Sequence, residues 1–209
     1  MENEPMVLDN ESNTVYIGKK NAMNYVLVIT TIFNKGSPTC TIKARGRAIS
    51  KAVDVAEITM RRFLSEAVEL KQVNIDSEEI TNEKGTTRSV STIELVLGKK
   101  DDDSIPKSPL VEFNEYEQSD ENTLFIGKKN ATAYTLVCVT IFNKGLETCV
   151  IRARGRSISR AVDVAEIVRK KFLTNAVDIA GIKIGSEEVE GQNGTRTVST
   201  IDIVLKKIS

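Results

Sequence analysis

The sequence has no histidine and no tryptophan, and it has only three cysteines and four prolines among 209 residues. Without histidine the chain cannot form the Cys/His ligand sets of zinc sites or a nucleophile activated by histidine. The cysteines, Cys40, Cys138 and Cys149, form no Cys-x-x-Cys pair and stand in apolar stretches. We therefore expect them to be buried packing residues, and we expect no metal, no cofactor and no small-molecule substrate.

Long apolar runs are also missing. No run approaches the ~18 to 20 residues that span a membrane, and residues 1–11 are acidic, whereas a signal peptide begins with basic residues. These absences favour a soluble intracellular protein of the cytoplasm, nucleoid or nucleus. The Walker and Gly-x-Gly-x-x-Gly patterns are absent too, and we interpret Lys51, Asp54 and Glu57 as surface charges of a helix. We expect no catalytic residue and no enzymatic activity.

An internal repeat divides the chain. Ile-Gly-Lys-Lys-Asn-Ala at 17–22 recurs at 126–131, and Ala-Arg-Gly-Arg at 44–47 recurs at 153–156, in both cases 109 residues later. Self-similarity of this kind indicates repeated structural units. We expect an acidic N-terminal tail (1–13), a first module (14–100), an acidic linker (101–121) and a second module (122–209).

The net charge of zero conceals a separation of charge along the chain. Residues 14–100 carry 14 basic and 9 acidic side chains, and residues 122–209 carry 14 and 8. Both modules are therefore basic, which favours a polyanionic partner. The acidic linker is either a solvated segment or a competitor for the basic faces, and its apolar residues are candidates for packing on a module: Leu110, Val111, Phe113 and Tyr116.

The order of predicted elements in each module is βαβαββ. In the first module, alternating residues indicate a strand over 14–17, and Asn21 is a candidate N-cap for a helix that ends before Gly36. A strand over 39–45, a helix from 49 to about 64, and two strands over about 68–80 and 88–97 follow. The predicted fold class is α/β: two tandem two-layer modules, each a four-stranded mixed sheet with both helices on one face.

Two basic loops in each module stand directly before a predicted helix. The lysine loop is Gly18-Lys19-Lys20, or 127–129 in the second module, and the arginine loop is Arg45-Gly46-Arg47, or 154–156. Helix N-termini offer free N–H groups and the positive end of the dipole, and cations beside them complete a phosphate site. Arginine and lysine bind phosphate without reading bases. Solvated surface charge is the alternative for any one loop, and the recurrence of both loops argues against it.

Three strings, in the same order and spacing, resemble the Alba family of DNA- and RNA-binding proteins. They are Ile-Gly-Lys-Lys, Lys-Ala-Arg-Gly-Arg-Ala-Ile-Ser-Lys-Ala-Val-Asp and Arg-Ser-Val-Ser-Thr-Ile-Glu. The resemblance implies a βαβαββ fold, a dimer as the binding unit, and a long hairpin that reaches along the duplex largely without sequence preference. It also implies that Phe63 and Phe172 contact neighbouring dimers, and the alternative for these rings is a place in the core.

The resemblance further assigns contacts with the nucleic-acid backbone to the lysine pairs, the loop arginines and one hairpin arginine per module. We place Arg88 and Arg196 at the base of the predicted hairpins, where an arginine either enters a minor groove or pairs with a strand carboxylate. The candidate nucleic-acid-binding residues are Lys19, Lys20, Lys43, Arg45, Arg47, Lys84, Arg88, Lys128, Lys129, Arg152, Arg154, Arg156 and Arg196.

Three functions remain open at this point, of which a protein-interaction scaffold that has lost nucleic-acid binding is the weakest. The first is a chromatin-like architectural protein that binds DNA or RNA independently of sequence, through a pseudo-dimer of its two modules or as a homo-oligomer. The second is an RNA-binding ribonucleoprotein scaffold, or a subunit associated with RNA processing or translation. The net charge of zero is low for an abundant DNA coat and favours the second.

Overall fold

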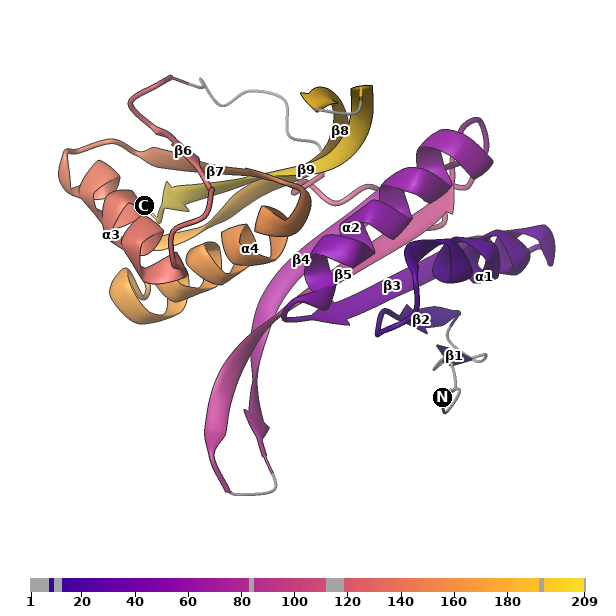
Figure 1. The fold of residues 1–209 in the computed structure, drawn as a ribbon, viewed down its shortest axis with the longest axis horizontal. Coiled ribbons are helices and arrows are strands. Elements are labelled where there is room, and N and C mark those ends of the chain that lie inside the picture. The colour runs from indigo at the N-terminus through magenta and orange to yellow at the C-terminus, as the bar shows by residue number, and fades with distance from the viewer. Residues whose placement is uncertain (1–7, 10–12, 83–84, 112–118, 192–193, 209) are drawn as a thin grey trace.

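The computed structural model describes residues 8–9, 13–82, 85–111, 119–191 and 194–208, which form two similar α/β modules (Figure 1). The first module consists of β2 (Thr14–Tyr16), α1 (Ala22–Asn34), β3 (Thr39–Arg45), α2 (Ala48–Ile58), β4 (Val68–Thr81) and β5 (Thr87–Lys99). The second consists of β6 (Thr123–Phe125), α3 (Ala131–Asn143), β7 (Thr148–Arg154), α4 (Ile158–Ile167), β8 (Val177–Gly191) and β9 (Gly194–Lys207). The predicted order βαβαββ is confirmed.

Each module contains one mixed sheet. The strand order is β1-β2-β3-β5-β4 in the first and β6-β7-β9-β8 in the second. Only β2 with β3 and β6 with β7 pair in parallel among these strands, because α1 and α3 supply the crossover that a parallel pair needs. The first sheet has one strand more than the predicted four, since β1 (Leu8–Asp9), in the expected tail, pairs antiparallel with β2.

The first helix of each module begins and ends as the sequence predicts. The Asn21 side chain accepts a hydrogen bond from the backbone N–H of Asn24 at 3.1 Å, and Asn130 caps α3 in the same way. Gly36 and Gly145 follow the two helices with φ values of 97° and 93°, a region that favours glycine. Both helices are rich in β-branched residues, which have a low intrinsic helix propensity. Burial of one apolar face therefore stabilises these helices.

The second helix of the first module covers the predicted range, but in both modules its last turn is a π-turn. Helix α2 continues as η1 (Thr59–Phe63), and α4 continues as η3 (Val168–Phe172); a short 3-10 turn, η2 (Gly155–Ser157), precedes α4. The wider turn is fixed by a hydrogen bond from the N–H of Leu64 to the carbonyl of Thr59 at 2.8 Å. It leaves the rings at the ends of η1 and η3 exposed to solvent.

The three thiols are buried packing residues, as the sequence predicts. Cys40, Cys138 and Cys149 are free and buried, and the sulfur atoms of Cys138 and Cys149 lie 3.1 Å apart between α3 and β7. Burial raises the pKa of the Cys40 thiol to about 12. Since the thiolate is the reactive form, Cys40 is chemically inert in the folded chain at neutral pH.

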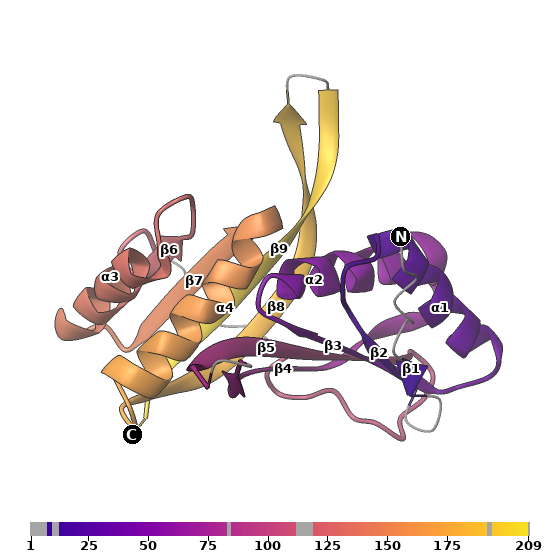
Figure 2. The same cartoon turned by 60° about the horizontal axis from the view of Figure 1, so that its bottom comes forward.

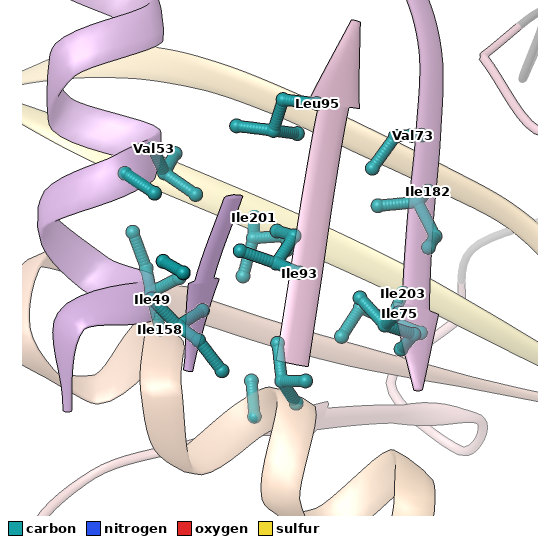
Figure 3. Close-up of a cluster of buried hydrophobic side chains, with 14 of the residues drawn as sticks. Ile49, Val53, Val73, Ile75, Ile93, Leu95, Ile158, Ile182, Ile201 and Ile203 are labelled. Atoms are coloured by element: carbon teal, nitrogen blue, oxygen red, sulfur yellow. The ribbon is translucent and has the colours of Figure 1, made fainter. Parts of the chain in front are cut away.

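The hydrophobic core is continuous between the two modules. Buried side chains of both modules belong to a single cluster. Figure 3 shows Ile49 of α2 and Ile93 of β5 gathered with Ile158 of α4 and Ile201 of β9, all at most 2% exposed. The modules are therefore packed against each other, and the apolar surface between them contributes to the stability of both.

Equivalent serines of α2 and α4 form the centre of this contact. The N–H of Ser50 donates to Ser159 Oγ and the N–H of Ser159 donates to Ser50 Oγ, both at 3.0 Å. The two hydroxyl oxygens are 2.8 Å apart. In a two-fold arrangement, residue i contacts residue j and j contacts i, and the paired serines obey this relation although they belong to one chain.

Two aspartates of these helices bond to serines of the opposite module. Ser91 of β5 donates its hydroxyl to Asp163 of α4 at 2.6 Å, and Asp54 of α2 bonds to Ser199 of β9. Burial raises the pKa of both carboxyl groups above the usual range, while the serine hydroxyls lower it in part. The hydroxyls therefore stabilise carboxylates that the contact between the modules has partly removed from water.

The interpretation of Lys51, Asp54 and Glu57 as surface charges is wrong. Glu57 is 5% exposed and accepts a hydrogen bond from the Ser186 hydroxyl of β8 at 2.6 Å. Burial raises the pKa of this carboxyl as well. The sequence could not show this, because the partner serine lies 129 positions away in the other module. Lys51 is also engaged, as described below.

The described part of the linker crosses from one module to the other. The N–H of Ser108 donates to the Lys71 carbonyl on β4, and the N–H of Ile182 on β8 donates to the Leu110 carbonyl, both at 2.8 Å. Lys107 forms an ion pair with Glu69 at 2.6 Å. Leu110 and Val111 pack against the core, as expected of apolar linker residues, whereas Phe113 and Tyr116 lie outside the described residues.

The double variant Ser91→Ala/Ser199→Ala is expected to lower the stability of the whole chain at pH 7. The variant loses two hydrogen bonds to charged groups at about 1.5 to 3 kcal/mol each, and their sum corresponds to roughly 6 to 24 °C in Tm for a chain of this size. The folded-state pKa of each aspartate is raised, so the deficit is largest where the carboxylates are charged and shrinks as the pH falls through that pKa. Thermal unfolding of both proteins at several pH values between about 7 and 4 measures it.

The matched control is Ser89→Ala, because Ser89 lies on the same strand and is exposed. This variant should unfold like the unmodified chain. A double variant with an unchanged Tm at pH 7 would contradict the role assigned to the serine hydroxyls.

Candidate nucleic-acid interface

The lysine loops are held from behind by side chains of the helices. The Tyr25 hydroxyl accepts the N–H of Gly18 at 2.8 Å, and the Lys51 ammonium group donates to the carbonyls of Gly18 and Lys20, both at 2.7 Å. In the second module Tyr134 accepts from Gly127 at 2.7 Å, and Arg160, the counterpart of Lys51, donates to the Gly127 carbonyl. These contacts turn the loop carbonyls inward. The side chains of Lys19, Lys128 and Lys129 are exposed and that of Lys20 is half-buried.

The sequence alone does not predict which side chains hold the lysine loops in place. Tyr25 and Tyr134 fall on the buried face of their helices, and nothing in the pattern shows that their hydroxyls reach a glycine seven residues earlier. For Lys51 and Arg160 the sequence does contain a pattern that indicates a shared role. A basic side chain recurs at the same place in both modules, one turn into the second helix.

The arginine loops require glycine at their centre. Gly46 and Gly155 have φ values of 53° and 52°, and a Cβ on Gly155 would lie 3.2 Å from a side-chain carbon of Val198. The N–H of Gly46 donates to the Ser91 carbonyl at 2.8 Å. This tight turn leads directly into the second helix, and the guanidinium side chains on either side of each glycine are exposed: Arg45, Arg47, Arg154 and Arg156.

The contact between the modules brings their arginine loops together. The carbonyl of Arg156 lies 3.4 Å from Ser50 Oγ, and the carbonyl of Arg47 lies 3.3 Å from Ser159 Oγ. The start of α2 therefore meets the start of α4. The positive ends of both helix dipoles and the cations beside them lie in one region, which repetition of the sequence motif alone does not establish.

One arginine of each loop is paired with a glutamate of its own hairpin. Arg45 Nη1 lies 3.1 Å from Glu78 Oε1 on β4, and Arg154 Nη1 lies 2.9 Å from Glu187 Oε1 on β8. All four side chains are 46 to 65% exposed. Pairs this exposed contribute little to stability, so the arginines can exchange the glutamate for another anion at small cost.

Lys43 and Arg152 occupy a different setting from the loop cations. Lys43 pairs with Glu94 at 2.7 Å, and Arg152 forms two hydrogen bonds with Asp202 at 2.8 and 2.7 Å. The hydrogen bonds to these carboxylates raise the pKa of both basic side chains. The two residues are half-buried on their sheets, whereas the arginines of the loops are exposed.

The hairpin arginines lie near the tips of the hairpins, and the expectation that they lie at the base is wrong. Arg88 pairs with Ile80, one position before the last pair of β4 and β5. Arg196 pairs with Val189, close to the end of β8 and β9. Both hairpins project beyond the body of the molecule, β4–β5 in Figure 1 and β8–β9 in Figure 2. Each exposed arginine stands two positions, about 7 Å, beyond the valine that lies against the glycine of its arginine loop, Val90 or Val198. Lys84 lies outside the described residues.

Phe63 and Phe172 end the π-turns and are 43 and 48% exposed. This exposure argues against the core role, and the contact with neighbouring dimers stays a prediction. Among the described residues no group of three histidine, cysteine, aspartate or glutamate side chains could hold a metal ion. No helix in the described ranges is long and apolar enough to cross a membrane.

Comparison with known proteins gives the family. The model of the Alba family matches residues 13–77 and 122–186. The DNA/RNA-binding protein Alba 1 of Archaeoglobus fulgidus is 53% identical over 88 residues, which cover 42% of this chain and 97% of that protein.

Two solved structures are also similar to this chain. Alba from Thermoplasma volcanium has 44% sequence identity and a TM-score of 0.39, covering 41% of this chain and 98% of that one. ALBA1 from Trypanosoma brucei has 23% identity and a TM-score of 0.36, covering 44% and 74%. The two segments matched by the family model make up most of the chain, which therefore belongs to the Alba family and carries two Alba modules in tandem.

Proposed function

We propose that the chain binds nucleic acid through the phosphate backbone, without preference for base sequence, and that its two modules together form the binding unit. The observation that carries the proposal is the reciprocal contact of Ser50 and Ser159, which sets the arginine loops of both modules beside each other. The name of the Archaeoglobus relative, a DNA/RNA-binding protein, supports a nucleic-acid ligand.

The chemistry of the loops supports phosphate recognition. Each arginine loop places exposed guanidinium groups beside the positive end of a helix dipole, which favours an anion. The N–H groups of Ser50 and Ser159 are used in the contact between the modules, so the side chains supply the donors. Each lysine loop adds two ammonium groups on a backbone fixed by Lys51 or Arg160. Arg88 and Arg196 add one exposed cation to each hairpin. Such contacts position a duplex and read no bases.

The proposed role is that of a chromatin-like architectural protein. A specific observation favours the alternative, an RNA-binding scaffold of a ribonucleoprotein or of RNA processing or translation. The net charge is zero, and Glu78 and Glu187 neutralise one arginine of each loop. A weakly basic binder of this kind suits regulated binding better than continuous coating of DNA.

Competition between duplex DNA, a DNA–RNA hybrid and structured RNA of equal length separates the two roles. Binding at about 50 and 200 mM salt should weaken steeply for every ligand, because counterions are released from the phosphates. Preference for duplex DNA supports the architectural role, and preference for RNA supports the ribonucleoprotein role. Absence of binding to all three ligands would refute the proposal.

Replacing the four loop lysines, Lys19, Lys20, Lys128 and Lys129, by alanine is expected to weaken binding to every nucleic acid. If each lysine neutralises one phosphate, the slope of log K against log salt should fall in magnitude by about 3.6, at roughly 0.9 per contact. Titration of a labelled duplex at several salt concentrations measures this slope.

The matched control removes four lysines from the opposite end of the modules: Lys35, Lys99, Lys144 and Lys207. Lys35 and Lys144 follow the last residues of α1 and α3, and Lys99 and Lys207 end β5 and β9. This variant has the same net charge. Equal losses in the two variants would show that general charge, and not the lysine loops, governs binding.

The variant Glu78→Gln/Glu187→Gln is expected to bind nucleic acid more tightly, because it frees Arg45 and Arg154 from their ion pairs. Exposed ion pairs are worth about 0.2 to 1 kcal/mol each, so loss of the two pairs should raise the affinity roughly twofold to thirtyfold beyond the control. The control is Glu79→Gln/Glu188→Gln, which alters the net charge equally at the adjacent exposed positions. The same affinity in both variants would contradict competition by the ion pair.

A further inference from the structure

Two aromatic rings stand exposed at equivalent positions of the modules. Tyr16 ends β2 and is 44% exposed, and Phe125 ends β6 and is 63% exposed. The neighbours of Phe125 in the chain, Leu124 and Ile126, are buried. Because successive strand residues point to opposite faces, both rings lie on the face of the sheet that is turned away from the helices. No role assigned to the loops or the hairpins uses them.

Each ring begins a row of three side chains across its sheet. In the second module the register places Phe125 beside Arg152 and Arg152 beside Asp202. The guanidinium carbon of Arg152 lies over the Phe125 ring, 5.8 Å from its centroid, and Asp202 holds the guanidinium plane through two hydrogen bonds. The ring is therefore supported by a fixed cation on one side, and most of its surface remains open to solvent.

The first module repeats this row with other residues of the same chemical kinds. Tyr16 stands beside Lys43, and Lys43 beside Glu94, with which it forms an ion pair at 2.7 Å. An aromatic ring, a cation and a carboxylate thus occupy the same three positions twice. Equivalent positions elsewhere differ freely, as Ile29 and Cys138 do.

Further cations adjoin the ring of the second module. Arg154 lies two positions beyond Arg152 on β7 and points to the same face, about 7 Å away. The lysine loop of this module, 127–129, starts two residues after Phe125. An aromatic platform flanked by cations is the combination that binds single strands, in which a base stacks on the ring and the cations hold adjacent phosphates. Bases inside a duplex are already stacked and cannot reach such a ring.

We propose that Phe125 and Tyr16 are stacking platforms for unpaired bases, and that the exposed part of each sheet around its ring binds single-stranded nucleic acid as a second mode of binding. The proposal rests on the proposed function, since it assumes a nucleic-acid ligand, and it adds a site that the loops and hairpins do not include. It assigns Arg152 and Lys43 the role of supporting the rings, in agreement with their pairing to Asp202 and Glu94.

The first test uses tryptophan as a reporter, because the chain contains none. In Phe125→Trp the single indole should be quenched when a short oligothymidylate binds, since a stacked base contacts the ring directly. A blunt duplex with the same number of phosphates should leave its emission unchanged. The matched control is Leu136→Trp, at a position on α3 that is 54% exposed, whose emission should not respond to either ligand. An unquenched Trp at position 125 with bound oligothymidylate would overturn the proposal.

The second test measures affinity. Phe125→Ala and Phe125→Leu should each weaken binding of the oligothymidylate by roughly 5-fold to 150-fold, because both lose the flat ring although leucine keeps apolar bulk. Binding of the blunt duplex should stay the same, and so should Tm, since the ring is exposed. Tyr16→Ala should act in the same direction.

The outcomes separate this inference from the proposed function. Unchanged affinity of the Phe125 variants for single strands, with duplex binding intact, overturns the inference alone. Equal losses for single strands and duplexes also overturn it, because the ring would then belong to the duplex site. Absence of binding of the unmodified chain to either ligand overturns both.

Discussion

The reciprocal hydrogen bonds of Ser50 and Ser159 join the second helices of the two modules, and the remaining structure depends on this contact. It places Ile49 and Ile158 in one hydrophobic cluster, so the cores of the two modules are continuous. It also buries carboxylates of aspartates and glutamates on α2 and α4. Serine hydroxyls of the opposite sheets satisfy three of these carboxylates, since a buried charge is tolerated only when it is hydrogen-bonded or paired.

The same contact determines where the basic loops lie. The proposed phosphate sites combine exposed cations with a rigid backbone. The cations come from short motifs, whereas the rigidity comes from groups that hold the loops from behind: the hydroxyls of Tyr25 and Tyr134, the basic groups of Lys51 and Arg160, and the glycines with positive φ. A substitution at one of these supporting positions therefore alters the rigidity of a loop, whereas removal of a surface charge does not.

Acidic side chains are distributed so that they moderate the basic surfaces. Glu78 and Glu187 pair with exposed loop arginines, while Glu94 and Asp202 hold Lys43 and Arg152 on the sheets. The exposed pairs dissociate at little cost, whereas the half-buried Arg152–Asp202 pair fixes the geometry around Phe125. A chain with no net charge can in this way keep local basic surfaces, because the sum over all residues does not describe their arrangement.

The sequence by itself determined the two modules, the order of their elements and the caps of α1 and α3, because these features follow from periodicity and from turn residues acting over a few positions. It also indicated which cations belong to the loops. Only the tertiary structure decided that Asp54 and Glu57 lie against the other module, that Arg88 and Arg196 stand near the hairpin tips, and that Lys51 holds a loop. These features depend on strand register and on packing between residues up to 129 positions apart, and local sequence patterns carry no information about such distant partners.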